Sequence, residues 1–143
     1  MIVLDTSVLV YAVGTEHPLR TPCIDLLTAA ADGLVAATTT TGVLQEFVHV
    51  RSRRRSRSDA VRLGRRYASL LSPLLPDSEL VLHEGLGVFE EADRLGAFDA
   101  VLAAAAIGAG ASALVSADRA FAEVPGLTQV FPDKEGIAAL LRG

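Results

Sequence analysis

The sequence predicts a single-domain α/β protein with a parallel central sheet of four to five short strands flanked by helices on both faces. Short apolar runs of strand length alternate with longer stretches of helical spacing, which is the pattern of a parallel sheet covered on both faces. The chain has 143 residues, half of them hydrophobic, which is enough for one domain with its own core. No linker or internal repeat interrupts it, so residues 1–143 are expected to form one unit.

Five apolar runs are candidate strands. In chain order they are Ile2–Leu4, Leu34–Thr38, Leu80–Leu82, Ala113–Val115 and Gln129–Phe131. The first run ends abruptly at a charged residue, Asp5, and has the character of a buried strand.

The first half of the chain also carries the start and stop signals of helices. Ser7–Val13 continues apolar until Gly14, and Pro22–Asp32 opens on a proline suited to a first helical turn. The threonine run at 38–41 offers an N-cap for the next helix. That helix carries Val43, Leu44, Phe47 and Val48 on one side.

Four more helices are predicted from Ser58 onward. Ser58 and Asp59 provide a cap and first turn for a helix that runs to about Leu71. The other three are Glu84–Leu95 with Gly96 as its stop, Phe98–Gly108, and Asp133–Leu141.

Four acidic residues fall where such a fold places its functional crevice, beyond the carboxyl ends of the strands. Asp5 follows the first strand, and Asp118 comes shortly after Leu114 and Val115. Glu46 and Asp99 lie near helix starts, and in a right-handed βαβ unit a helix starts at the edge where the preceding strand ends. Asp99 joins the set only if its helix begins at that edge.

Carboxylates brought together repel one another unless a cation neutralises them. Oxygen ligands of this kind suit Mg²⁺ or Mn²⁺, which can activate water and stabilise the charge of an attacked phosphodiester. Each acid also has an ordinary structural explanation: Asp5, Asp99 and Asp118 as caps or turn formers, and Glu46 as a solvated helix residue. The hydroxyls beside the acids would either hold a carboxylate or cap the backbone. They belong to Thr6, Ser7 and Ser116.

At this point the sequence resembles a known family. The motifs are DTSVLVYA at 5–12, QEF at 45–47, FDAVLAAAA at 98–106 and VSADRAFAEVPGL at 115–127. Together and in this order they resemble the PIN domain, and more narrowly the VapC toxins of bacterial toxin–antitoxin pairs. The resemblance runs nearly end to end and implies a PIN-like fold.

The resemblance also implies roles for individual residues. Asp5, Asp99 and Asp118 match direct metal ligands, and Glu46 matches an acid that helps through water. Thr6 and Ser116 match the hydroxyl positions beside those acids. The segment after Glu46 departs from the family pattern in ending at His49. No role is assigned to His49, to Asp93 or to the other two histidines, His17 and His83.

The activity implied is Mg²⁺- or Mn²⁺-dependent endonuclease cleavage of RNA. The substrate we expect is a structured cellular RNA, either tRNA or rRNA. The partners implied are a second copy of the chain and a cognate antitoxin protein that blocks the site. The lone Cys23 and the lack of a signal peptide or spanning segment predict a protein of the reducing cytoplasm with no membrane partner.

The charge of the chain is unevenly distributed. Residues 51–66 hold eight Arg and one Asp, a local charge of +7, whereas the rest of the chain sums to −11. Arginines here would offset repulsion between an acidic site and RNA. The RNA-contact candidates are Arg51, Arg53, Arg54, Arg55 and Arg57. A solvated basic loop or a dimer contact is the alternative. Because only 5 % of residues are aromatic, base stacking is not expected to be the main binding mode.

Three other readings compete with the nuclease. A phosphatase of the haloacid dehalogenase type needs a second Asp two residues after the first, where this chain has Ser7. A receiver domain needs an Asp after its third strand, where this chain has His83. A catalytically inactive PIN-like RNA-binding or regulatory module stays open as the alternative, although all four acids are present.

Overall fold

The computed structural model describes all residues, 1–143, and has a four-stranded parallel sheet at its centre. Its strands are β1 (Ile2–Leu4), β2 (Ala37–Thr38), β3 (Ala113–Val115) and β4 (Gln129–Val130). They lie in the order β2-β1-β3-β4, and every pairing is parallel. The two central strands are wholly buried, as expected for apolar runs covered on both faces.

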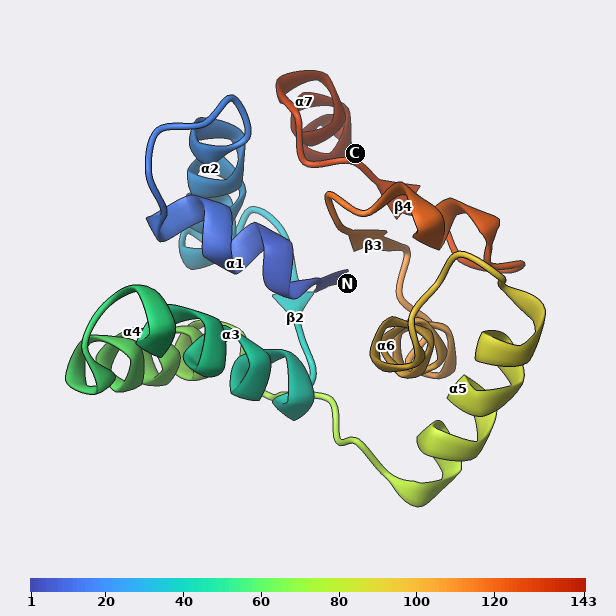
Figure 1. The fold of residues 1–143 in the computed structure, drawn as a ribbon. Helices are drawn as coiled ribbons and strands as arrows, with labels where there is room; N and C mark the ends of the chain where they lie inside the picture. Colours follow the sequence, from blue (N-terminus) through green and yellow to red (C-terminus); the bar gives the residue numbers. More distant parts are fainter.

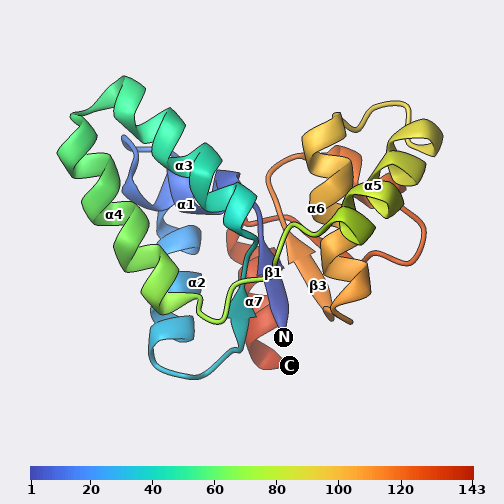
Figure 2. The same ribbon diagram turned by 90° about the horizontal axis from the view of Figure 1, so that it is seen from below.

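Seven α-helices and one 3₁₀-helix surround the sheet. They are α1 (Thr6–Val13), α2 (Arg20–Ala31), α3 (Thr41–Arg54), α4 (Arg57–Leu70), α5 (Glu79–Glu91), α6 (Ala97–Gly108), η1 (Arg119–Glu123) and α7 (Lys134–Arg142). Figure 1 shows α5 and α6 on one side of the sheet and α1, α2 and α7 on the other. Figure 2 shows α3 and α4 side by side next to β2, opposite the α5–α6 pair.

An aromatic contact fixes α3 and α4 against α1. The rings of Phe47 and Tyr67 meet edge to face with centroids 5.0 Å apart. The Tyr67 hydroxyl donates to the carbonyl oxygen of Leu9 at 3.1 Å, which satisfies its one polar group in the core. Phe47 is completely buried. This cluster sets the relative position of α1 and α3, the two helices that border the site described below.

The structure confirms the predicted strands at β1, β3 and β4, and the threonine cap at Thr40, whose hydroxyl accepts from the Val43 amide. The predicted strand Leu34–Thr38 shrinks to Ala37–Thr38. The predicted strand Leu80–Leu82 is wrong, because these residues form the first turns of α5. The Ser78 hydroxyl accepts from the Val81 amide and starts that helix five residues earlier than expected.

Two helix boundaries also differ from the prediction. Gly96 does not end α5 but is the N-cap residue of α6, with ψ of 161°. The cap of α4 is Ser56 rather than Ser58, because the Ser56 hydroxyl accepts from the Asp59 amide at 3.1 Å. The arginines at 51–54 therefore belong to the last turn of α3 and are not a loop. No helix has the length and apolar character needed to cross a membrane.

Candidate active site

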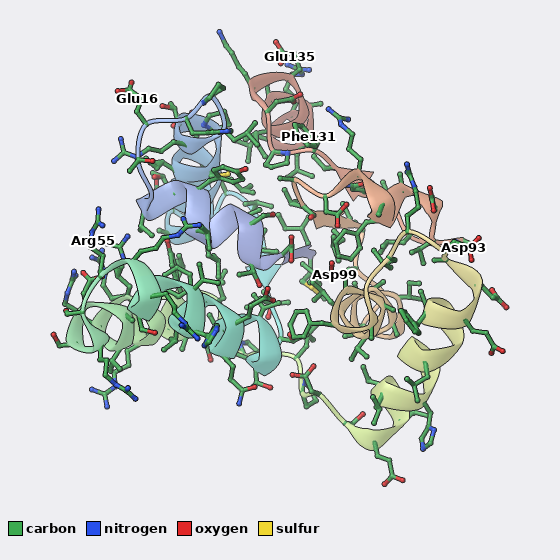
Figure 3. All side chains as sticks on the ribbon, viewed as in Figure 1. Glu16, Arg55, Asp93, Asp99, Phe131 and Glu135 are labelled. Carbon is green, nitrogen blue, oxygen red and sulfur yellow. The ribbon has the colours of Figure 1, made fainter.

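All four predicted acids line one pocket of about 410 Å³, although they come from four separate parts of the chain. Asp5 follows β1, Glu46 lies on α3, Asp99 lies in the first turn of α6, and Asp118 precedes η1. Figure 3 shows Asp99 at the centre of the molecule, pointing from α6 toward the space between α1 and α3. Asp99 is expected to join the other acids only if its helix begins at the edge of the sheet where the strands end. The helix α6 does begin at the edge where β1 and β3 end.

Asp5 occupies the N-cap position of α1, but its carboxylate makes no capping hydrogen bond. Instead, its Oδ2 atom accepts from the Ser7 hydroxyl at 2.8 Å and from the Ser116 hydroxyl at 2.7 Å. The Asp5 amide donates to the carbonyl of Val115, which ties the residue to the end of β3. The ordinary explanation of Asp5 as a helix cap therefore fails. A buried carboxylate is held in one orientation, with Oδ1 left without a partner from the chain.

Glu46 and Asp118 each accept a hydrogen bond on one carboxylate oxygen. The Thr6 hydroxyl donates to Oε2 of Glu46 at 3.0 Å and so joins the start of α1 to α3. Asp118 does act as a cap, because its Oδ1 accepts from the Ala120 amide at 2.9 Å. The backbone amide of Asp118 in turn donates to the Ser116 hydroxyl at 3.0 Å. Each carboxylate keeps its second oxygen available to the pocket.

Asp99 differs from the other three because no hydrogen bond holds its carboxylate. The N-cap of α6 is Gly96, so capping does not explain Asp99. Its pKa is raised to about 7, chiefly because burial removes the carboxyl group from water. The negative charges of Asp5, Glu46 and Asp118 raise the pKa further. The acids are therefore close enough to repel one another.

None of the four acids forms an ion pair with a basic side chain. The ion pairs of the chain are Arg51–Asp59, Arg62–Asp59, His83–Glu79 and Arg94–Glu123, and none includes a pocket acid. Oxygen-rich, net negative and unpaired, the donor set fits Mg²⁺ or Mn²⁺. No three carboxylates are already arranged as a complete ligand group. A cation bound here would therefore need water molecules among its ligands, and Mg²⁺ usually keeps several of them.

The arginine block divides into residues with different surroundings. Arg51 is a structural residue, since its side chain is only 14 % exposed and it binds Asp59 at 2.6 Å and the Val13 carbonyl at 3.0 Å. The structure thus gives Arg51 a role other than the predicted RNA contact. Arg54 lines the acid pocket. Arg53 and Arg57 border a separate hollow beside His49, and Arg55 is exposed.

Comparison with known proteins places the fold and motifs in a family. The PIN domain family matches residues 2–127. The chain belongs to the PIN domain family. Ribonuclease VapC7 of Mycobacterium tuberculosis is 56 % identical over 142 residues, which cover 99 % of this chain and 98 % of that relative. The resemblance to the PIN domain and to VapC proteins is therefore confirmed.

A solved structure shares the same fold. The crystal structure of VapBC2 from Rickettsia felis, bound to a DNA fragment from their promoter, contains a chain that superposes with a TM-score of 0.71. The match covers 92 % of this chain and 98 % of that one, at 20 % identity. At that identity the likeness shows the PIN domain fold and nothing finer.

In this PIN domain, the pocket also includes two residues that sequence reasoning missed. Tyr11 and His17 line it together with the acids, and their rings contact each other in a tilted arrangement. The signal available in the sequence was the aromatic at the seventh position of the DTSVLVYA motif. His49 borders the hollow with Arg53, whereas Asp93 and His83 are exposed and lie outside the acid pocket. Figure 3 shows Asp93 near the α5–α6 turn, far from Asp99.

Proposed function

We propose that this chain is a Mg²⁺- or Mn²⁺-dependent endoribonuclease that acts as the toxin of a toxin–antitoxin pair. The observation that carries the proposal is the pocket in which four carboxylates converge and none of them is ion-paired. The name of the relative from Mycobacterium tuberculosis, a ribonuclease, supports the reaction class. RNA hydrolysis at such a site requires no protein nucleophile.

The residues of the pocket have different proposed roles. Asp5, Asp99 and Asp118 would hold the cation, and Glu46 would act through water. When bound, the cation would activate water for attack and stabilise the charge that develops on the phosphodiester. Ser116 and Thr6 orient Asp5 and Glu46 through the hydrogen bonds of 2.7 and 3.0 Å.

A cleavage assay tests this function. Total RNA is incubated with the protein in Mg²⁺ or Mn²⁺ and in chelator, and the products are separated by size. We expect cleavage only with metal, and a loss of at least about 100-fold in Asp5→Asn, since changes to groups that merely support metal ligands cost roughly 10–100-fold. Asp93→Asn is the matched control, because this exposed acid lies outside the pocket. Equal cutting by wild type and Asp5→Asn would overturn the assignment. RNA binding without cleavage would favour the inactive RNA-binding module.

The substrate we propose is a structured cellular RNA, tRNA or rRNA, with exposed arginines at the block contacting phosphates. These are Arg53, Arg54, Arg55 and Arg57. Sequencing of RNA ends after induced expression tests the substrate class. New ends spread evenly over messenger RNAs would argue against it.

The proposed protein partners are an antitoxin that covers the acid pocket and a second copy of the chain. The solved neighbour is named as a VapBC protein, which supports an antitoxin. An apolar stripe on α5 supports a homodimer, since Leu82, Leu86 and Phe89 are spaced by four and three residues and are each nearly half exposed. Light scattering tests the dimer: we expect the mass of two chains, reduced to one by Leu86→Glu. A wild-type mass of one chain would rule the dimer out.

A further inference from the structure

The acid pocket extends beyond the carboxylates along α1 and α3. Its lining continues through Tyr11 and Gly14 of the α1 end, through His17 of the following loop, and to Arg54 at the end of α3. Asp5 and Tyr11 are six residues apart along α1, which corresponds to about 9 Å of helix. The pocket therefore has an acidic end and a second end of different chemistry.

The second end carries a fixed pair of rings. The ring centroids of Tyr11 and His17 are 4.5 Å apart and the planes are tilted by 33°. The backbone amide of Leu19 donates to Nδ1 of His17 at 3.1 Å, which holds the imidazole in place. Because Nδ1 accepts this bond, the proton of the neutral ring lies on Nε2. His17 is exposed and Tyr11 is half-buried, so the pair presents ring surface to the pocket.

A positive charge lies at the same end. Arg54 is exposed at the last residue of α3 and lines the pocket with the two rings. One turn earlier, Arg51 donates to the carbonyl of Val13 at 3.0 Å and keeps the ends of α1 and α3 together. Ring surface beside a guanidinium is the combination that binds an unpaired nucleotide, with the base stacked and its phosphate paired.

We propose that Tyr11, His17 and Arg54 form a nucleotide-binding subsite that takes an unpaired RNA base and a neighbouring phosphate. This inference rests on the proposed ribonuclease function and assigns part of its substrate contact. A stacked strand advances roughly 3.4 Å per nucleotide, so the 9 Å offset places this base two or three nucleotides from the phosphate at the acids. An RNA loop with one splayed base fits the subsite, while the arginine block still supplies most of the phosphate contacts.

Fluorescence of 2-aminopurine tests the subsite, because stacking quenches this base. The probe is an oligouridine octamer with one internal 2-aminopurine, titrated with the Asp99→Asn protein to suppress cleavage. We expect binding with quenching. His17→Ala should weaken binding at least about fivefold, the lower limit for loss of one stacked base, and abolish the quenching. His17→Phe should restore both, and His83→Ala, an exposed histidine outside the pocket, should change neither.

Failure of the octamer to bind or to be quenched would overturn the subsite, as would unchanged binding and quenching in His17→Ala. The test has no cleavage readout, so its result is separate from that of the nuclease assay. If the wild type cuts RNA and the quenching is absent, the subsite fails and the ribonuclease proposal stands. If quenching depends on His17 and no RNA is cut, the subsite stands and the ribonuclease proposal fails.

Discussion

Asp5 occupies a helix N-cap position, where the carboxylate of an aspartate usually accepts a hydrogen bond from a backbone amide. Here the carboxylate accepts hydrogen bonds from the hydroxyls of Ser7 and Ser116 instead. The two hydroxyls hold the carboxylate in one orientation at the pocket. Asp118 shows that the two uses are compatible, because one oxygen caps η1 and the other is left to the pocket. Residue identity alone does not separate a cap from a ligand; the position of the hydroxyl donors does.

Asp99 leads to a prediction about stability and pH in the metal-free protein. Its pKa of about 7 lies above the ordinary value of 3.8, so between about pH 4 and 7 the folded protein binds a proton that the unfolded chain has lost. Stability therefore falls as pH rises through this window, and the full penalty is present above pH 7. We expect Asp99→Asn to raise the free energy of unfolding at pH 8 by about 1–2 kcal/mol, allowing for solvent screening.

Urea unfolding in chelator measures this effect. At pH 4 the carboxyl is neutral in the folded state, so the gain from Asp99→Asn should nearly vanish there. Asp93→Asn is the control, since this acid is exposed and lies outside the pocket. If Asp99→Asn raised the free energy of unfolding equally at both pH values, the claim that the other acids and burial destabilise charged Asp99 would be contradicted.

At the scale of elements, α5 shows where sequence patterns fail to predict the secondary structure. Leu80–Leu82 are three apolar residues, a run too short for periodicity to distinguish strand from helix. The choice is made by the Ser78 cap and by close packing of α5 on α6, a contact that no local pattern displays. By contrast, the helices at 7–13, 22–32 and 98–108 have clear caps or stops, and the structure confirms them within two residues.

Gly85 is the point of that close packing and carries a prediction. A Cβ added there would lie 2.6 Å from Cα and 3.0 Å from the backbone N of Val101, so α5 must move away from α6. We expect Gly85→Ala to lower the free energy of unfolding by about 1–3 kcal/mol. Gly87→Ala, on the same helix with nothing within 4 Å, should raise it by about 0.5–1 kcal/mol. Denaturant midpoints measure both, and shifts in the same direction would disprove the close approach.

At the scale of the whole molecule, the parallel sheet explains why the convergence of acids was predictable. All strands point the same way, so β1 and β3 end at one edge and bring Asp5 and Asp118 together. The far end of the pocket was not predictable, because it depends on how the loop after α1 folds back. That loop brings His17 onto Tyr11, and its sequence shows no periodic signal.

The uneven charge of the molecule predicts how RNA binding depends on salt. Each lost phosphate contact lowers the slope of log affinity against log salt by roughly 0.7–0.9. Replacing Arg53, Arg55 and Arg57 by Gln should therefore flatten the slope by about 2–3 and weaken binding in low salt. A control variant replaces Arg94 and Arg142, which lie outside the block. Filter binding over a salt series measures the slopes, and an unchanged slope in the first variant would exclude the block from RNA contact.

The central claim is that the four acids form one cation site, and direct metal binding tests it most simply. Mn²⁺ is titrated into wild type, Asp5→Asn and Asp93→Asn, and free Mn²⁺ is followed by its electron paramagnetic resonance signal. We expect wild type and Asp93→Asn to bind Mn²⁺ alike, and Asp5→Asn to bind at least about tenfold more weakly. Equal affinity in wild type and Asp5→Asn would contradict the claim.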